Sequence, residues 1–371
     1  MHMLLQSLDI FKWYLAIQIL SIIGFVLGYS LFSSFKFHGY SVSKASGLFI
    51  VSVITWFVCN AKLAILPYSS LALYIIVFIL SGFTAYVYSK NKNEINTLVN
   101  AFASLGTKKV RITGGEPCLR SDVTDIVKQC KNTPGIEKVA ITTNGFNLFN
   151  KIDEFYSAGL DALNISIDSL NPSMFKLITG HDKLTHILKG IDRAIELGIK
   201  DIKINAVLAK QFNKNQLNDF LDWVKHKKVT VRFIELMETG NGATFFEQNH
   251  LSGQSVKTQL LAQGWLQVVR GKLNGPAEEF CHPDFEGRIG LIMPYSKDFC
   301  KSCNRLRVSS LGKLHLCLFA EQGIDLRPHL NAQDMPATVN AIQAAMGNKT
   351  ISHELNKRLT GATTHLAMLG G

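Results

Sequence analysis

Residues 110–117 read VRITGGEP, a short β-branched run that ends in two glycines, a glutamate and a proline. Four further runs of this kind follow, each after a stretch with helical character: VAITT (139–143), LNISID (163–168), IKINAVL (202–208) and VRFIEL (231–236). Strands that alternate with helices predict consecutive βα units and a parallel sheet. An open doubly wound sheet and a barrel both satisfy this pattern. No G-x-G-x-x-G follows the first strand, which disfavours a dinucleotide-binding sheet.

The first 92 residues have a different composition. Trp13–Phe32 and Tyr68–Tyr88 are uncharged throughout, and Gly47–Cys59 is a shorter apolar run that reaches spanning length only if Lys62 snorkels toward an interface. We expect about three transmembrane helices here, with membrane contact through residues 13–89. A cleaved signal peptide is the competing interpretation, but the first run exceeds the length of a signal core. The lysine distribution places the following part in the cytoplasm, tethered to the inner face of the membrane.

The chain is basic, with a formal net charge of +11, and it contains seven cysteines. A basic surface suits anionic ligands or an anionic membrane face, and a solvated basic surface is an equally open interpretation. No basic run interleaved with aromatic residues is present, so we expect no nucleic-acid partner. Cysteines in a cytoplasmic chain are more often metal ligands or free thiols than disulfides.

The predicted strands end in small and polar residues. These ends read TGGEP (113–117), TTNG (142–145), SIDSL (166–170), NAVLAK (205–210) and ELMETG (235–240). In a βα barrel the chemistry gathers at the carboxyl ends of the strands, and glycines let backbone amides approach a ligand closely. Each of these motifs taken alone is explained equally well by a simple turn.

The stretch FCKSCNRLRVSSLGKLHLCLF (299–319) contains three cysteines in the spacing C-x2-C-x13-C. These are Cys300, Cys303 and Cys317. This spacing resembles the C-terminal iron–sulfur site of the GTP 3′,8-cyclases. A [4Fe–4S] cluster needs four ligands, so three thiolates leave one iron free, and the resemblance implies that this iron takes a substrate atom. A structural zinc site is the alternative, with Cys281, His282 or His315 as its fourth ligand.

From about Asn93 to Gly371 the chain resembles the GTP 3′,8-cyclases, the molybdenum cofactor biosynthesis protein A family. The motifs that carry the resemblance are AFASLGTKKVRITGGEP, RFIELMETG, FCHPD, GLIMPY, CKSCNRLR and the terminal Gly370-Gly371. The resemblance implies an α/β fold, an incomplete (βα)6 TIM-like radical SAM barrel of about five strands with a C-terminal iron–sulfur extension. We therefore expect a transmembrane segment at 1–92, a partial barrel at 93–245 and an iron–sulfur and GTP-binding region at 246–371.

The same resemblance implies the site residues. Cys300, Cys303 and Cys317 match the ligands of one [4Fe–4S] cluster. The positions that match contacts to GTP are Arg111, Thr142, Lys203, Arg305, Leu306 and Arg307, with Lys109 as an additional phosphate partner. The positions that match contacts to S-adenosylmethionine are Gly115, Glu116, Ser166 and Met237. No side chain is assigned as a catalytic acid or base. The implied activity is that of a lyase, the radical SAM conversion of GTP to (8S)-3′,8-cyclo-7,8-dihydroguanosine 5′-triphosphate in molybdenum cofactor biosynthesis.

The chain departs from this family in one respect. The family's first barrel strand leads into C-x3-C-x2-C, which holds a second [4Fe–4S] cluster, and no such motif is present in these 371 residues. Where this cysteine loop would be expected, upstream of the first predicted strand, the positions at the same spacing are occupied by Ala64, Tyr68 and Leu71. We expect the membrane segment to take the place of the family's first βα unit. The loss of that unit's strand also predicts an unpaired sheet edge, at Val110–Thr113 or at the strand on its far side.

Three accounts of this departure are open: a fusion or start-site artefact, a membrane-tethered remnant that binds GTP without turnover, or an enzyme completed by another chain. A radical enzyme acting on peptides is a weaker alternative. A homodimer and an unidentified electron donor are left open as partners.

Overall fold

The computed structural model describes residues 93–358, apart from 212–215, 241, 270–274, 297–298, 301–302, 320–322, 348, 350–354 and 356–357. The predicted membrane spans and the terminal Gly370-Gly371 lie outside these residues. Within the part of the chain that is described, no helix is both long and apolar enough to cross a membrane. Residues 93–371 form one compact unit, so the predicted division at 245/246 falls inside it.

Eight strands form one sheet in the order β1-β2-β3-β4-β5-β8-β7-β6. The strands are β1 (Lys109–Ile112), β2 (Lys138–Thr143), β3 (Ala162–Ser166), β4 (Asp201–Leu208), β5 (Thr230–Glu235), β6 (Leu266–Gln267), β7 (Glu278–Cys281) and β8 (Arg288–Ile292). The five predicted strands are β1 to β5, and their parallel pairing confirms the predicted sheet. β8 adds a sixth parallel strand beside β5, and β7 and β6 follow in antiparallel pairing. These three strands were not predicted from the sequence.

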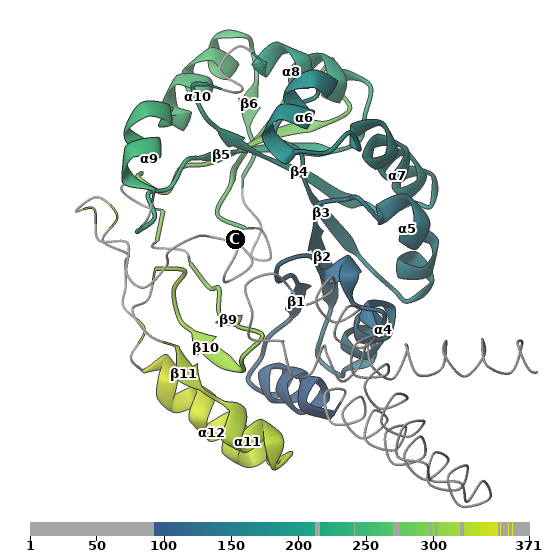
Figure 1. The fold of residues 1–371 in the computed structure, drawn as a ribbon, viewed down its shortest axis with the longest axis vertical. Helices are drawn as coiled ribbons and strands as arrows, with labels where there is room; N and C mark the ends of the chain where they lie inside the picture. The colour runs from purple at the N-terminus through teal and green to yellow at the C-terminus, as the bar shows by residue number, and fades with distance from the viewer. Residues whose placement is uncertain are drawn as a thin grey trace, which may run out of the picture. The chain divides into compact units, whose positions relative to one another are not determined.

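The helices between β1 and β8 cover the outer face of this curved sheet (Figure 1). They are η1 (Pro117–Leu119), α4 (Val123–Asn132), α5 (Leu148–Ser157), α6 (Pro172–Thr179), α7 (Leu184–Glu196), α8 (Leu217–Lys225), α9 (Ala243–Asn249) and α10 (Gly253–Ala262). A doubly wound sheet carries helices on both faces, whereas a barrel carries them on one. Of the two folds that the sequence left open, the doubly wound sheet and the barrel, the structure is therefore of the barrel type.

The sheet does not close into a full barrel among the described residues. β1 lies at one end of the strand order and pairs only with β2. The predicted unpaired edge at the first strand stays a prediction, because the residues before Asn93 lie outside those that the structure describes. The backbone groups on the free side of β1 are the ones that a further strand would pair with.

The helices begin and end where local chemistry requires it. Asn171 caps α6, since its side chain accepts a hydrogen bond from the Met174 amide at 3.0 Å, and Pro172 occupies the first turn. Gly180 ends α6 with a φ of 74°, a left-handed conformation that glycine adopts without strain. α7 then buries Leu184, Ile187, Ile191 and Ala194 against the main core.

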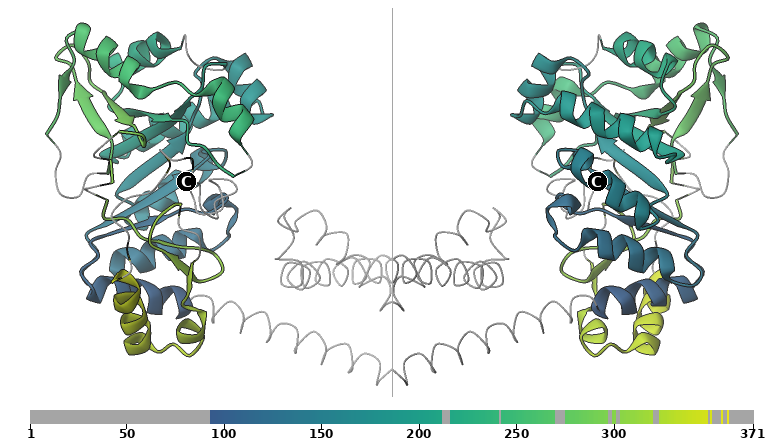
Figure 2. Two further views of the ribbon diagram at one scale, coloured as in Figure 1. Left: turned by 90° about the vertical axis from the view of Figure 1, so that its left-hand side faces the viewer. Right: turned by 90° about the vertical axis from the view of Figure 1, so that its right-hand side faces the viewer.

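The C-terminal part forms a smaller layer with its own core. Three short strands, β9 (Arg307–Val308), β10 (Lys313–His315) and β11 (Ile324–Asp325), pair in the order β11-β10-β9. Helices α11 (Arg327–Asn331) and α12 (Met335–Met346) follow them. Helical residues 93–104 contribute Ala101 to this second core, and Arg327 donates to the Glu94 carboxylate at 2.8 Å. The blue helix and the yellow C-terminal helices accordingly lie side by side in both views of Figure 2.

Gly190 gives a test of the packing between α5 and α7. A Cβ atom at this position would lie 2.9 Å from the Phe149 amide nitrogen and 3.0 Å from Leu148 Cγ. We expect Gly190→Val to destabilise the chain by about 2–3 kcal/mol, because backbone atoms cannot move aside cheaply. The measurement is thermal unfolding followed by circular dichroism. Lys189→Val is the matched control, since Lys189 is exposed on the same helix and carries only the ~0.5 kcal/mol propensity cost. Equal shifts for the two variants would contradict the predicted contact.

Candidate active site

The inner face of the sheet is polar, which is unusual for parallel strands. In β4, the side chains of Ile202, Ile204, Ala206 and Leu208 are buried, and they alternate with partly accessible Asp201, Lys203, Asn205 and Val207. Successive side chains of a strand point to opposite faces, so the apolar set packs beneath the helices and the polar set faces the other way. This alternation builds a site on the face that the helices leave uncovered.

Strand register brings the predicted GTP contacts together on this face. Thr142 of β2 is paired with Asn164 of β3, and Asn164 is paired with Lys203 of β4. Arg111 of β1 is paired with Ala140, whose partner on β3 is Ala162. All of these positions have the same parity along their strands and so share a face. The hydroxyl of Thr142 is buried there with no hydrogen-bond partner among the described residues.

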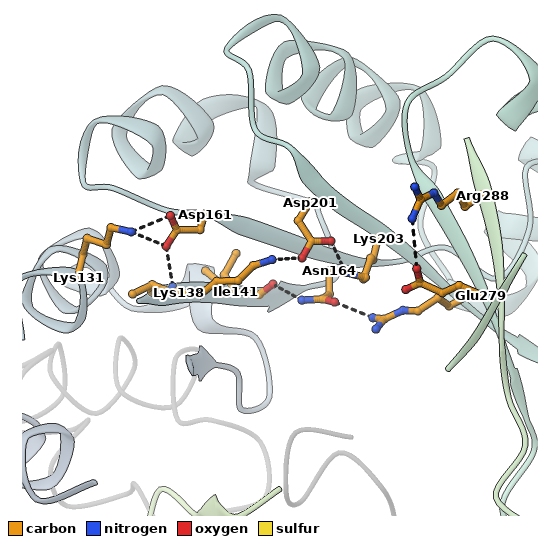
Figure 3. Close-up of polar contacts among 11 residues, drawn as sticks. Lys131, Lys138, Ile141, Asp161, Asn164, Asp201, Lys203, Glu279 and Arg288 are labelled. Carbon is orange, nitrogen blue, oxygen red and sulfur yellow. Dashed lines mark hydrogen bonds and ion pairs between the residues drawn. The ribbon is translucent and has the colours of Figure 1, made fainter. Parts of the chain in front are cut away.

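Arg232 is a site residue that the sequence analysis missed. Its guanidinium donates to the Asn205 Oδ1 from Nε at 3.0 Å and from Nη2 at 2.6 Å, and Nη2 also donates to the Asn164 Oδ1 at 2.6 Å. Asn164 is itself held by the carbonyl of Ile141 at 3.2 Å (Figure 3). The signal was present in VRFIEL, where a charged residue interrupts an otherwise apolar strand. Asn164 and Asn205 likewise interrupt β3 and β4.

The cations of this face act on one another electrostatically. Burial, followed by Arg111, lowers the pKa of Arg232 to about 9, with Asp201 and Glu279 opposing the shift. Burial and the charge of Arg305 also lower the pKa of Arg111, although solvent reaches its side chain. Five cations therefore share one neighbourhood: Lys109, Arg111, Arg232, Arg305 and Arg307. None of the five has an ion-pair partner among the described residues.

Crowded cations without carboxylates are costly in a folded protein unless an anion joins them. Lys109 shows this cost. Its pKa is lowered to about 8, first by burial and then by Arg111, Lys138 and Lys203, against which Asp201 alone acts. The arrangement suits a ligand with several negative charges, because such a ligand offsets the repulsion between the cations.

The predicted S-adenosylmethionine contacts lie at the carboxyl ends of the strands. Gly115 follows β1, Ser166 ends β3 and Met237 follows β5, so all three lie at carboxyl ends. Lys109, Lys138 and Asp201, in contrast, begin β1, β2 and β4. Among the predicted GTP contacts, Lys203 lies near the amino end of β4, whereas Arg111 and Thr142 lie in the carboxyl halves of β1 and β2, so these contacts extend along the strands.

Glu116 ties the glycine turn after β1 to the end of β2. Its Oε1 accepts from the Thr143 hydroxyl at 2.7 Å and from the Cys118 amide at 2.9 Å, and its Oε2 accepts from the Asn144 amide at 2.7 Å. These bonds hold the Gly115 backbone in place. The predicted contact between Glu116 and the amino group of a cofactor stays a prediction. Met237 is followed by Glu238, whose amide donates to the Tyr295 hydroxyl at 3.0 Å.

Two cysteines of the C-terminal motif, Cys303 and Cys317, lie near Arg305 and Arg307. Burial raises the pKa of the Cys303 thiol, but the Arg305 backbone amide and guanidinium outweigh it, and the net pKa is lowered. Cys303 and Cys317 both act on Arg307, whose pKa is lowered to about 10 by burial and by Arg305. Lys349 donates to the carbonyls of Cys303 and Arg305 at 3.2 Å each, which fixes the loop. A thiol biased toward thiolate is the form that binds iron.

The donor set of the C-terminal motif is compatible with an iron–sulfur cluster. Three thiols beside cations suit a cluster whose thiolates and sulfides carry negative charge. Among the described residues, no three His, Cys, Asp or Glu side chains already converge on a single ion. The Nδ1 atom of His315 is buried without a partner among them, so the zinc alternative keeps a candidate ligand. Leu306 is partly buried and packs against the second core. The predicted role of each of these residues stays a prediction.

Comparison with known proteins gives two family matches. Residues 73–224 match the Radical SAM superfamily, and residues 229–355 match Molybdenum Cofactor Synthesis C. The first match begins inside the predicted span Tyr68–Tyr88, and neither match supports replacement of the first unit by a membrane segment.

Curated relatives match the same part of the chain. A GTP 3′,8-cyclase of Vibrio vulnificus (strain YJ016) is 51% identical over 282 residues, covering 76% of this chain and 84% of its own length. One of Vibrio parahaemolyticus is 50% identical, with coverages of 77% and 88%. One of Aeromonas hydrophila is 52% identical, with coverages of 75% and 82%. On these matches the chain belongs to the GTP 3′,8-cyclase family, with a radical SAM domain followed by a molybdenum cofactor synthesis domain.

Proposed function

We propose that this chain acts on GTP as a GTP 3′,8-cyclase, a lyase of molybdenum cofactor biosynthesis, and that residues 93–371 supply the GTP side of the reaction. The observation that carries the proposal is the group of five cations without ion-pair partners on the polar face of the sheet. A triphosphate provides the negative charge that these cations lack. Family membership provides the identity of the nucleotide.

Different side chains would bind the phosphates and the guanine base of GTP. Arg111 of β1, Lys203 of β4 and Arg232 of β5 would bind phosphate oxygens, with the Asn164 and Asn205 amides orienting Arg232. Arg305 and Arg307 follow Cys303 in the chain, and they would bind the part of GTP nearest the cluster. A [4Fe–4S] cluster held by Cys300, Cys303 and Cys317 would supply an iron with an open position for a substrate atom.

The residues present do not fit a second cluster. Its three thiolates need C-x3-C-x2-C, and the cysteines other than the C-terminal triad are Cys59, Cys118, Cys130 and Cys281, none at that spacing. Cys118 is buried, and burial raises its pKa to about 12, which disfavours the thiolate. The contacts proposed for S-adenosylmethionine at Gly115, Ser166 and Met237 thus have no cluster ligands beside them within this chain. A second candidate function follows from this, namely GTP binding without turnover.

The cluster proposal predicts one four-iron cluster per chain after anaerobic reconstitution of the full-length protein. We expect Cys303→Ser to lose the cluster, because two thiolates do not retain the cube. The measurements are iron and sulfide content and the electron paramagnetic resonance spectrum of the reduced protein. Cys130→Ser, in a buried thiol of α4, is the control and should keep its iron. About eight irons per chain, or one zinc with no iron, would defeat the assignment.

The GTP proposal predicts that the reconstituted chain binds GTP, and release of 5′-deoxyadenosine separates the cyclase from a protein that binds GTP without turnover. Arg305→Ala should weaken GTP binding by about tenfold to a hundredfold, the value of one charged hydrogen bond. The measurements are calorimetric affinity and product formation under dithionite.

Arg193→Ala is the control for this prediction. It removes an arginine that is paired with Asp153 on the outer helices, and the variant should bind GTP normally. Unaltered binding by Arg305→Ala would refute the site. Formation of 5′-deoxyadenosine would show that thiolates for a second cluster come from elsewhere, and would favour the cyclase over the binding protein.

A membrane tether through residues 13–89, with the remaining chain on the cytoplasmic face, is also proposed. It rests on the uncharged runs Trp13–Phe32 and Tyr68–Tyr88 and on the lysines around them. The full-length chain is expected to sediment with membranes and to resist extraction by alkaline carbonate. Its recovery in the soluble fraction without detergent would overturn the tether while leaving the GTP site untouched.

A further inference from the structure

One carboxylate lies between two lysines at the amino end of the sheet. Asp201 is the first residue of β4, and its Oδ2 accepts a hydrogen bond from Lys138 Nζ while its Oδ1 accepts one from Lys203 Nζ. Figure 3 shows the three side chains in a row above the strands. Neither Lys138 nor Asp201 was among the residues predicted from the sequence. The bridge links an unassigned pair directly to the predicted GTP contact Lys203.

Small residues on β2 and β3 leave room for the Lys138 side chain to reach Asp201. Lys138 begins β2, and β3 lies between β2 and β4. The β3 residue paired with Asp201 is Ala162, and the β2 residue paired with Ala162 is Ala140. Both alanines are almost fully buried. The Lys138 side chain therefore crosses β3 where short side chains leave room, and it reaches the carboxylate from the side opposite to Lys203.

Lys203 needs this carboxylate electrostatically. The cations that act on it are Arg232 and, from β1, Lys109, and the carboxylates are Asp201 and Glu279. Arg111 and Lys138 face the same carboxylate from β1 and β2. Glu279 also acts on Arg232 and lies 3.7 Å from Arg288, so it is shared. Asp201 is the carboxylate in direct contact with Lys203.

We propose that Asp201 is a positioning residue for the phosphate-binding site: it keeps the Lys203 ammonium charged and directed toward the polar face, while Lys138 holds the carboxylate in place. An ammonium has three protons, so donating one to Asp201 leaves others for a phosphate oxygen. The inference rests on the proposed function only in naming a nucleotide phosphate as the ligand of Lys203.

Asp201 and burial shift the pKa of Lys203 in opposite directions. Burial lowers its pKa, and Asp201 is the first influence that raises it again. A lysine loses its charge as the pH rises through its pKa. Removing the carboxylate moves that loss to lower pH, so phosphate binding should fail earlier on an alkaline titration. Asp201 itself stays ionised, because Lys203 and Lys138 outweigh burial and hold its pKa well below the usual range.

The first measurement does not involve GTP. The full-length chain in non-ionic detergent is labelled with a trace of acetic anhydride between about pH 7 and pH 10.5, and the acetylated fraction of Lys203 is read by peptide mass spectrometry. Exposed Lys189 is the internal reference. We expect Lys203 of Asp201→Asn to become reactive at least one pH unit below that of the unmodified chain. Coincident Lys203 profiles would overturn the proposal.

The second measurement is GTP affinity by calorimetry between about pH 7.5 and pH 9.5, above the range in which phosphate itself titrates. We expect Asp201→Asn to lose about tenfold more affinity across this range than the unmodified chain. Adding Lys203→Arg to Asp201→Asn should recover most of that loss, because a guanidinium stays charged. Lys109 is present in both of these variants, so the difference between them isolates Lys203.

Asp192→Asn is the matched control, since Asp192 also accepts from a lysine, Lys227, but on the outer helices. It should behave as the unmodified chain in both measurements. A merely structural role for Asp201 would lower affinity equally at every pH and would not respond to Lys203→Arg, and that outcome overturns the proposal. A shifted labelling profile combined with no GTP binding by any variant would refute the proposed function and the phosphate role together, while the charge coupling between Asp201 and Lys203 would stand.

Discussion

The rest of the site depends on the helices covering one face of the sheet only. A parallel sheet covered on both faces needs apolar side chains at nearly every strand position. Here β4 alternates buried Ile202, Ile204 and Ala206 with Asp201, Lys203 and Asn205, and this is stable because the second set has no helix above it. The strand register then aligns polar residues from β1 to β5 across one surface. A charged surface of this kind could not form in a doubly wound fold.

Electrostatic tension is the second property of that surface. Arg111, Arg232 and Arg307 all have pKa values lowered by burial and by their neighbours, and the carboxylates that oppose this are few. Such a group of cations lowers the stability of the unliganded protein and raises its affinity for anions. The protein limits the cost with neutral partners, since the amides of Asn164 and Asn205 orient Arg232 without cancelling its charge. Charge therefore remains for a ligand.

The two ends of the strands have different tasks. At the carboxyl ends, Glu116 uses both of its oxygens to hold the turns after β1 and β2. At the amino ends, Asp201 joins Lys138 to Lys203. The C-terminal layer is attached through helical residues 93–104, whose side chains enter both hydrophobic cores. The loop with Cys303 and Arg305 is thereby held by a layer that packs against the segment preceding β1.

The sequence by itself determined the βα order, the strands β1 to β5, the cysteine triad and the family, because these depend on local periodicity, on spacing and on motifs that are contiguous in the chain. It did not determine that β8, β7 and β6 continue the sheet, since these short strands carry no periodic signal of their own and their pairing is long-range. Arg232, Asn164, Lys138 and Asp201 were missed for a related reason. A single polar residue in a strand shows its purpose only when neighbouring strands bring its partners to the same row of the sheet. Only the tertiary structure decided between a barrel and a doubly wound sheet, because that choice depends on which face the helices pack against.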